Sequence, residues 1–174
     1  WLPDTRDAVE QETYIRLWEP TGARGFNVPT GTHLFGNLFF PKIVKKWTSK
    51  RLEWCATLDD QTRARICAVG HRDFGKTSIA TVWADRQLAM RLSRHILYTS
   101  SEEKIAIRRT NIMRSHLVNA DIRAMFGNFR PLKNNQHTAT FAKDGWYLVD
   151  PRTKVPFAAV QPRGSNQTVN GSIA

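Results

Sequence analysis

The chain has 174 residues, of which 41% are hydrophobic, and this length and composition allow one substantial buried core. No run approaches the ~18 apolar residues of a membrane span, and no basic-then-apolar leader is present, so we expect a soluble, intracellular protein without a membrane partner. The 26 Lys and Arg against 15 Asp and Glu give a formal net charge of +11. Such a large positive charge predicts a polyanionic partner such as nucleic acid. The alternative explanation of the charge is a generally basic surface.

The first 60 residues are predicted to form a mostly helical extension. Residues 7–18 have a helical pattern, and Pro20 is expected to end this helix. Residues 20–33 are rich in glycine, which predicts an irregular connection. Pro41 is expected near the start of another helix, with three apolar residues on one side: Ile43, Val44 and Trp47.

Residues 70–77 read Gly-His-Arg-Asp-Phe-Gly-Lys-Thr, a complete G-x-x-x-x-G-K-[ST] phosphate-binding loop. Its glycines let the backbone approach a phosphate chain closely. Lys76 is expected on the β- and γ-phosphates, and the Thr77 hydroxyl on Mg²⁺. ATP and Mg²⁺ are therefore the expected cofactors, and the expected binding residues are Gly70, His71, Arg72, Asp73, Phe74, Gly75, Lys76, Thr77 and Ser78.

The flanks of the loop support this interpretation. Residues 65–69 form an apolar, β-branched run of strand length before the loop. After it, a helix is predicted from apolar residues at near-helical spacing, namely Ile79, Val82, Trp83 and Met90. Strand, loop and helix follow in the order that a phosphate-binding loop requires.

A second strand is predicted at residues 95–99, and residues 100–103 have the pattern of a capping box that begins a long helix. The expected buried stripe of this helix is Ile105, Ile112, Met113 and Leu117. Three arginines elsewhere on its circumference are candidates for DNA contact, with a solvated helix face as the alternative: Arg108, Arg109 and Arg114.

A short helix and turn are predicted over residues 121–129. Residues 146–150 and 155–160 predict two extended runs, a hairpin-like pair at a sheet edge. Asp150 ends an apolar strand, as a metal-holding carboxylate would, but Pro151 and the absence of a neighbouring Glu favour a hairpin role. We expect the hydrolytic carboxylates beyond Ala174.

Strands alternate with helices over residues 64–120, which predicts a parallel sheet flanked by helices. The expected fold class is α/β, a P-loop NTPase of the RecA-like or ASCE type. Residues 61–174 would form the ATPase core, cut before its acidic, Walker B-type strand. Cys55 and Cys67 are expected to be reduced, and the five histidines show no metal-ligand spacing.

Residues 70–79 closely resemble the arginine-containing phosphate loop of the large terminase subunit, the motor that packages DNA into tailed bacteriophage heads. Arg72 occupies the place of an arginine that this family associates with ATP hydrolysis. The resemblance continues more weakly through His95–Ala106 and Asn119–Gly127, and upstream in Phe39–Val44 and Leu52–Cys55.

The resemblance implies an ATPase with Arg72 and Lys76 as catalytic residues. It further implies a homo-oligomeric ring that translocates duplex DNA into a prohead, with the prohead portal and the small terminase subunit as partners. The location would be the cytoplasm of the bacterial host, with transient docking on the prohead. The family's acidic strand, coupling motif and nuclease domain are absent, so this part of the protein is expected to bind ATP without efficient hydrolysis.

Three other functions fit parts of the pattern. A helicase-like ATPase would share the loop and the positive charge. A nucleotide kinase would need a small-substrate site and a lid, for which the charge gives no reason. A basic binding module with a vestigial loop would not bind nucleotide at all.

Overall fold

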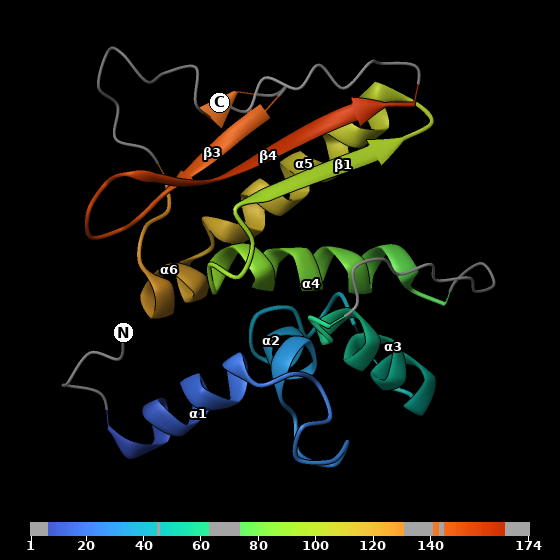
Figure 1. Ribbon diagram of the computed structural model, residues 1–174, viewed down its shortest axis with the longest axis vertical. Coiled ribbons are helices and arrows are strands. Elements are labelled where there is room, and N and C mark those ends of the chain that lie inside the picture. The colour runs from blue at the N-terminus through green and yellow to red at the C-terminus, as the bar shows by residue number, and fades with distance from the viewer. Residues whose placement is uncertain (1–6, 45, 63–73, 131–140, 143–144, 166–174) are drawn as a thin grey trace. The chain divides into compact units, whose positions relative to one another are not determined.

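The computed structural model describes residues 7–44, 46–62, 74–130, 141–142 and 145–165 (Figure 1). These residues form a mixed α/β protein of helices and a four-stranded sheet. The chain divides into two compact units, residues 1–86 and residues 87–174, which are described separately below. The expected domain boundary near residue 60 stays a prediction.

The first unit is helical in its described part. Helix α1 (Ala8–Trp18) begins where predicted, because the Asp7 carboxylate accepts a hydrogen bond of 2.8 Å from the Glu10 N–H. Helices α2 (Gly31–Phe39) and α3 (Ser49–Asp59) follow, and α4 (Lys76–Ala89) runs to the end of the unit and beyond it. The helix predicted after the phosphate loop is therefore confirmed.

The structure corrects the prediction for residues 31–47. Helix α2 was not expected, and the helix predicted from Pro41 is wrong, because residues 41–44 form a turn. Phe40 leaves the helical conformation (φ −134°, ψ 45°), and Pro41 follows it as a residue that ends a helix rather than one that starts the next. Two glycines lower the helix propensity of α2, whose stability comes from burial.

Aromatic packing forms much of the core of the first unit. The Phe35 ring lies 4.8 Å from Phe39 and 5.8 Å from Phe40, measured between centroids. A Cβ on Gly36 would come within 2.6 Å of the Trp47 ring, so only glycine permits this approach. Burial lowers the pKa of His33, whose ring lies 4.9 Å from that of Trp47.

The second unit contains a mixed sheet of β1 (His95–Ser100), β2 (Phe141–Ala142), β3 (Gly145–Val149) and β4 (Pro156–Gly164), in the order β1-β4-β3-β2. β1 pairs with β4 in parallel, from His95 opposite Ala159 to Ser100 opposite Gly164, whereas the other described pairs are antiparallel. The expected parallel sheet is therefore present in the described residues only as the β1 and β4 pair.

The predicted second strand and the predicted hairpin are confirmed, but the position of the hairpin is not. β4 lies inside the sheet, hydrogen-bonded to β1 on one side and to β3 on the other, rather than at an edge. Its alternating burial over nine residues shows that one of its two faces is more deeply buried than the other.

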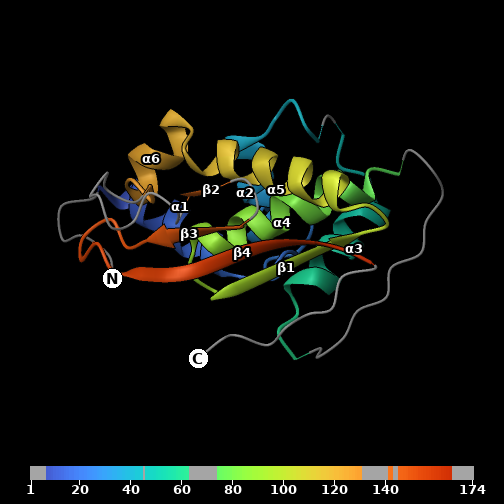
Figure 2. The ribbon, with the colours of Figure 1, turned by 90° about the horizontal axis from the view of Figure 1, so that it is seen from above.

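Helix α5 (Glu103–Leu117) lies against β1 and β4, and α6 (Ala120–Phe126) follows it (Figure 2). The predicted stripe of α5 is half right. Met113 and Leu117 are buried, but Ile105 is 41% exposed and Ile112 is only partly buried, because the face toward the sheet is Ala106, Thr110, Met113 and Leu117.

The predicted capping box at residues 100–103 is wrong. Ser100 is the last residue of β1, and its carbonyl accepts from the Ser165 N–H at 2.8 Å. The N-cap of α5 is Glu102, which makes no side-chain cap hydrogen bond. Ser100 therefore belongs to the strand, although the local pattern assigned it to the start of the helix.

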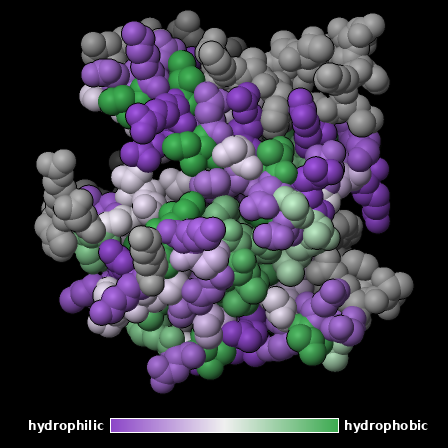
Figure 3. Space-filling model, turned by 180° about the vertical axis from the view of Figure 1, so that it is seen from behind, coloured by the Kyte–Doolittle hydropathy of each residue, from purple (hydrophilic) through white to green (hydrophobic). Residues whose placement is uncertain are grey.

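Hydrophilic side chains make up much of the face shown in Figure 3, with hydrophobic ones between them. None of the helices in the described ranges has the length and apolar character that crossing a membrane would require.

Candidate nucleotide-binding site

The described part of the predicted loop is its second half. Phe74 and Gly75 precede α4, and Lys76, Thr77 and Ser78 form its first turn. Four residues predicted to bind nucleotide lie outside the described residues, as does the strand predicted at residues 65–69: Gly70, His71, Arg72 and Asp73.

Gly75 makes the turn from which α4 starts. Its φ of +86° lies in the left-handed region that favours glycine, and its carbonyl accepts the Ile79 N–H at 2.9 Å. The N–H groups of a helix's first turn have no acceptor inside the helix, and the positive end of the helix dipole lies there. The start of α4 can therefore bind an anion such as phosphate.

The two predicted ligand side chains stand on that first turn. Lys76 is half-buried and Thr77 is exposed. The Thr77 carbonyl accepts from the Thr81 hydroxyl at 2.8 Å. A hydroxyl oxygen is a ligand type that Mg²⁺ accepts, so the exposed Thr77 side chain fits the predicted metal role.

Arg51, on the first turn of α3, contacts the loop and was not predicted. Its Nε donates to the Phe74 carbonyl at 3.0 Å, and its Nη1 donates to the Lys46 carbonyl at 2.6 Å. Its guanidinium carbon lies 5.9 Å from the centre of the Phe74 ring. No local pattern distinguishes Arg51 from the other arginines of the chain.

Trp54, one turn along α3 from Arg51, also contacts Phe74. The two ring centroids are 5.9 Å apart. The Trp54 Nε1 is buried without a hydrogen-bond partner in the described structure. Together Arg51 and Trp54 tie α3 to the residue that precedes Gly75.

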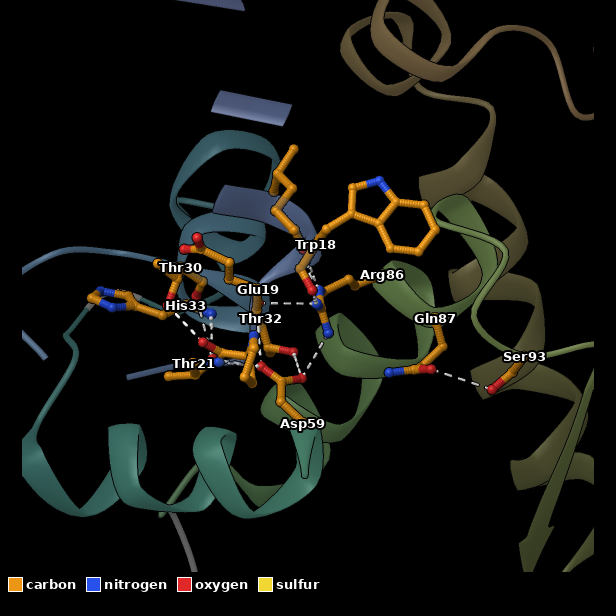
Figure 4. A network of polar contacts seen from close by, with 12 residues as sticks. Trp18, Glu19, Thr21, Thr30, Thr32, His33, Asp59, Arg86, Gln87 and Ser93 are labelled. Carbon is orange, nitrogen blue, oxygen red and sulfur yellow. Dashed lines mark hydrogen bonds and ion pairs between the residues drawn. The ribbon is translucent and has the colours of Figure 1, made fainter. Parts of the chain in front are cut away.

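A buried ion pair connects α4 to the rest of the first unit (Figure 4). The Arg86 Nη1 lies 2.9 Å from the Asp59 Oδ1, and the two side chains are 2% and 0% exposed. Burial lowers the pKa of Arg86, and the Asp59 charge opposes this shift. Arg86 also donates to three carbonyls at the end of α1, those of Leu17, Trp18 and Glu19.

Asp59 is fully hydrogen-bonded on its other side. Its Oδ2 accepts from the Thr21 N–H (3.0 Å), the Thr21 hydroxyl (2.6 Å) and the Thr32 N–H (3.0 Å), while its Oδ1 accepts from the Thr32 hydroxyl at 2.7 Å. Sequence reasoning did not find this network, whose members are far apart in the chain.

The three arginines proposed for DNA do not share one face of α5. Arg108 is exposed and lies opposite the buried stripe, whereas Arg109 and Arg114 are half-buried and flank that stripe on its two sides. Lys104 and Ser115 share the exposed face with Arg108.

Asp150 has the hairpin role that was favoured. Its Oδ1 accepts from the Arg152 and Thr153 N–H groups at 2.7 and 3.1 Å, and its Oδ2 accepts from the Arg91 Nη1 at 2.6 Å. Desolvation alone would raise the pKa of Asp150, but these backbone hydrogen bonds and the Arg91 charge outweigh it and lower the pKa.

Cys55 is free, as predicted, and it is also buried. Burial raises the pKa of its thiol, and the Asp59 charge adds to this effect. Cys67 lies outside the described residues.

The chain matches no family model and has no significant match among curated proteins or solved structures. Function must therefore be argued from the loop and the residues around it.

Proposed function

We propose that the chain binds Mg-ATP through residues 70–78 and is the nucleotide-binding part of a motor that moves duplex DNA. The observation that carries this proposal is the complete loop pattern, whose described end is a left-handed Gly75 followed by the first turn of a 14-residue helix. On this proposal the fold is that of a P-loop NTPase of the RecA-like or ASCE type.

Each loop residue has a role in the proposal. Lys76 places a positive charge on the β- and γ-phosphates, and the Thr77 hydroxyl holds Mg²⁺, which when bound neutralises phosphate charge. Arg72 stabilises the charge that develops during hydrolysis, as the resemblance to the large terminase subunit implies.

The partners follow from charge and from the resemblance. A net charge of +11 favours phosphate contacts to duplex DNA without sequence preference, which a packaging motor needs. The resemblance to the large terminase subunit implies a homo-oligomeric ring that docks on a prohead portal and has the small terminase subunit as a partner. The location would be the cytoplasm of a bacterial host.

The alternatives differ in what stimulates turnover. Hydrolysis by the full-length protein that rises on addition of duplex DNA supports a motor, whereas phosphate transfer to a small acceptor supports a nucleotide kinase. A helicase-like motor would differ from a packaging motor by separating the strands of the duplex.

The first prediction concerns Lys76. Lys76→Ala removes the charge assigned to the β- and γ-phosphates, so we expect it to abolish most Mg-ATP binding in calorimetry. Lys104→Ala is the control, because it removes the same charge from an exposed position on α5. Equal ATP affinity in Lys76→Ala and in the unmodified chain would contradict the proposal.

A further inference from the structure

We propose that Arg51 is a positioning residue of the nucleotide site, which holds the turn at Phe74 and Gly75 and adds its positive charge at the start of α4. This inference rests on the proposed function, because a positioning role requires that the loop bind phosphate. It goes beyond the loop pattern, which contains no residue of α3.

The first step is the pair of hydrogen bonds that Arg51 makes. It donates from Nε to the Phe74 carbonyl and from Nη1 to the Lys46 carbonyl, at 3.0 and 2.6 Å. One planar guanidinium thus joins the segment before α3 to the segment before α4. A lysine has a single ammonium group and cannot reproduce this two-point geometry.

The second step is the position of the guanidinium against Gly75. A Cβ built on Gly75 would lie 3.5 Å from the Arg51 Nη2, 3.7 Å from its Cζ and 3.8 Å from its Nε. The charge therefore lies beside the backbone from which the first turn of α4 starts. Among the described residues the hydrogen bonds of Arg51 come from Nε and Nη1, and on this proposal the Nη2 N–H groups would donate to a phosphate oxygen.

The third step is that the ring of Phe74 is held from the same helix. Arg51 and Trp54 are three residues apart and lie on one side of α3, each 5.9 Å from the Phe74 ring. The Trp54 contact to the Phe74 ring does not involve Arg51, so it remains when Arg51 is replaced. A loss of ATP affinity on replacing Arg51 can therefore be separated from unfolding.

The test compares two arginines that bind backbone carbonyls. Arg51→Gln removes the contact to the loop, and Arg16→Gln removes the contact of Arg16, which donates from Nε and Nη2 to the Pro29 carbonyl at 3.1 and 2.6 Å. We expect Arg51→Gln to weaken Mg-ATP binding by at least about tenfold, the effect of one charge-assisted contact, and to weaken AMP binding less. Arg16→Gln should leave both affinities unchanged while lowering the melting temperature similarly.

Arg51→Lys separates charge from geometry. It keeps the charge and loses the two-point hydrogen bonding, so its ATP affinity should fall between those of the unmodified chain and Arg51→Gln. If Arg51→Gln does not fold, Arg51→Lys decides, because reduced ATP affinity at an unchanged melting temperature supports the positioning role.

Three results would overturn the inference. Unchanged ATP affinity in a folded Arg51 variant overturns it and leaves the proposed function intact. An equal loss in Arg16→Gln shows that the effect is not specific to the loop. An unmodified chain that binds no ATP removes the proposed function and this inference together.

Discussion

Gly25 and Gly31 share a left-handed backbone but differ in their surroundings. Gly25 has φ +80° and nothing within 4 Å of a Cβ built on it. Gly31 has φ +56°, and a Cβ there would lie 2.5 Å from the Asp59 Oδ2, 2.6 Å from the Thr21 nitrogen and 2.7 Å from the Glu19 carbonyl oxygen. Only at Gly31 does the missing side chain make room for a buried polar network.

The two glycines give a matched pair of substitutions. Gly25→Ala should cost only the left-handed conformation of an L-residue, about 1–2 kcal/mol. Gly31→Ala should cost this and a further ~1–3 kcal/mol, because backbone and carboxylate atoms must move away from the new methyl group. The free energy of unfolding in urea measures both costs, and equal values would show that the Asp59 surroundings of Gly31 can relax.

At the scale of elements, Arg86 acts as a cap for a helix other than its own. The last carbonyls of a helix have no intrahelical donors, and Arg86 supplies donors to the end of α1 from a position on α4. Asp59, the last residue of α3, neutralises the positive charge of Arg86. Three helices thus share one buried guanidinium.

Removing either partner of this ion pair should be costly. Arg86→Met leaves the Asp59 carboxylate buried without its cation, and we expect a loss of about 3–5 kcal/mol in the free energy of unfolding. Asp59→Asn should also destabilise, and the double variant should lose less than the sum of the two, as a double-mutant cycle would show.

Arg24 provides the control for Arg86, because it pairs with Glu12 and Glu19 at the surface. Arg24→Met should lower the free energy of unfolding far less, because water can hydrate the two carboxylates once Arg24 is removed. Additive losses for Asp59 and Arg86 would mean that the two side chains stabilise the unit independently.

Elements with strong periodicity were predictable from the sequence, and those decided by tertiary contacts were not. The apolar spacing of α4 and the run Ile-Leu-Tyr-Thr in β1 are local signals that the structure confirms. Pro41 was misread because proline can follow a helix as well as start one. Ile105 was misread because Ala106 is the buried residue instead, and a small residue gives a weak apolar signal.

The candidate site was predictable only as far as it is local. Lys76 and Thr77 belong to one short motif, so spacing alone assigns them. Arg51 contacts Phe74 across 23 residues, and Arg86 contacts Asp59 across 27, with no pattern to connect them. Such pairs depend on how helices pack, which composition and periodicity do not encode.

At the scale of the whole molecule, the net charge of +11 is the property that bears on DNA. Arg108 is the exposed one of the three candidate arginines on α5. If Arg108 contacts a phosphate, Arg108→Gln should make the slope of log affinity against log salt less steep by about 0.9. The reason is that one fewer phosphate is neutralised and the counterions condensed on it are not released. ATP affinity should not change.

Fluorescence anisotropy with a mixed-sequence duplex between about 50 and 200 mM salt measures this slope. Arg24→Gln is the control, since the charge of Arg24 is already engaged by two carboxylates. Two results would favour a regulatory DNA-binding protein over a motor. One is a DNA affinity of the complete protein that does not change with salt concentration, and the other is a preference of ~10³ or more for one sequence.

The central place of β4 sets an order for biosynthesis. His95 pairs with Ala159, so β1 leaves the ribosome well before its parallel neighbour has been translated. Until Gly164 emerges, the nascent chain carries α5 and β1 without the strand that completes their shared core, and β1 has an open edge toward β4. The second unit therefore closes only after β4 has been translated, and until then the unpaired edge of β1 is open to aggregation.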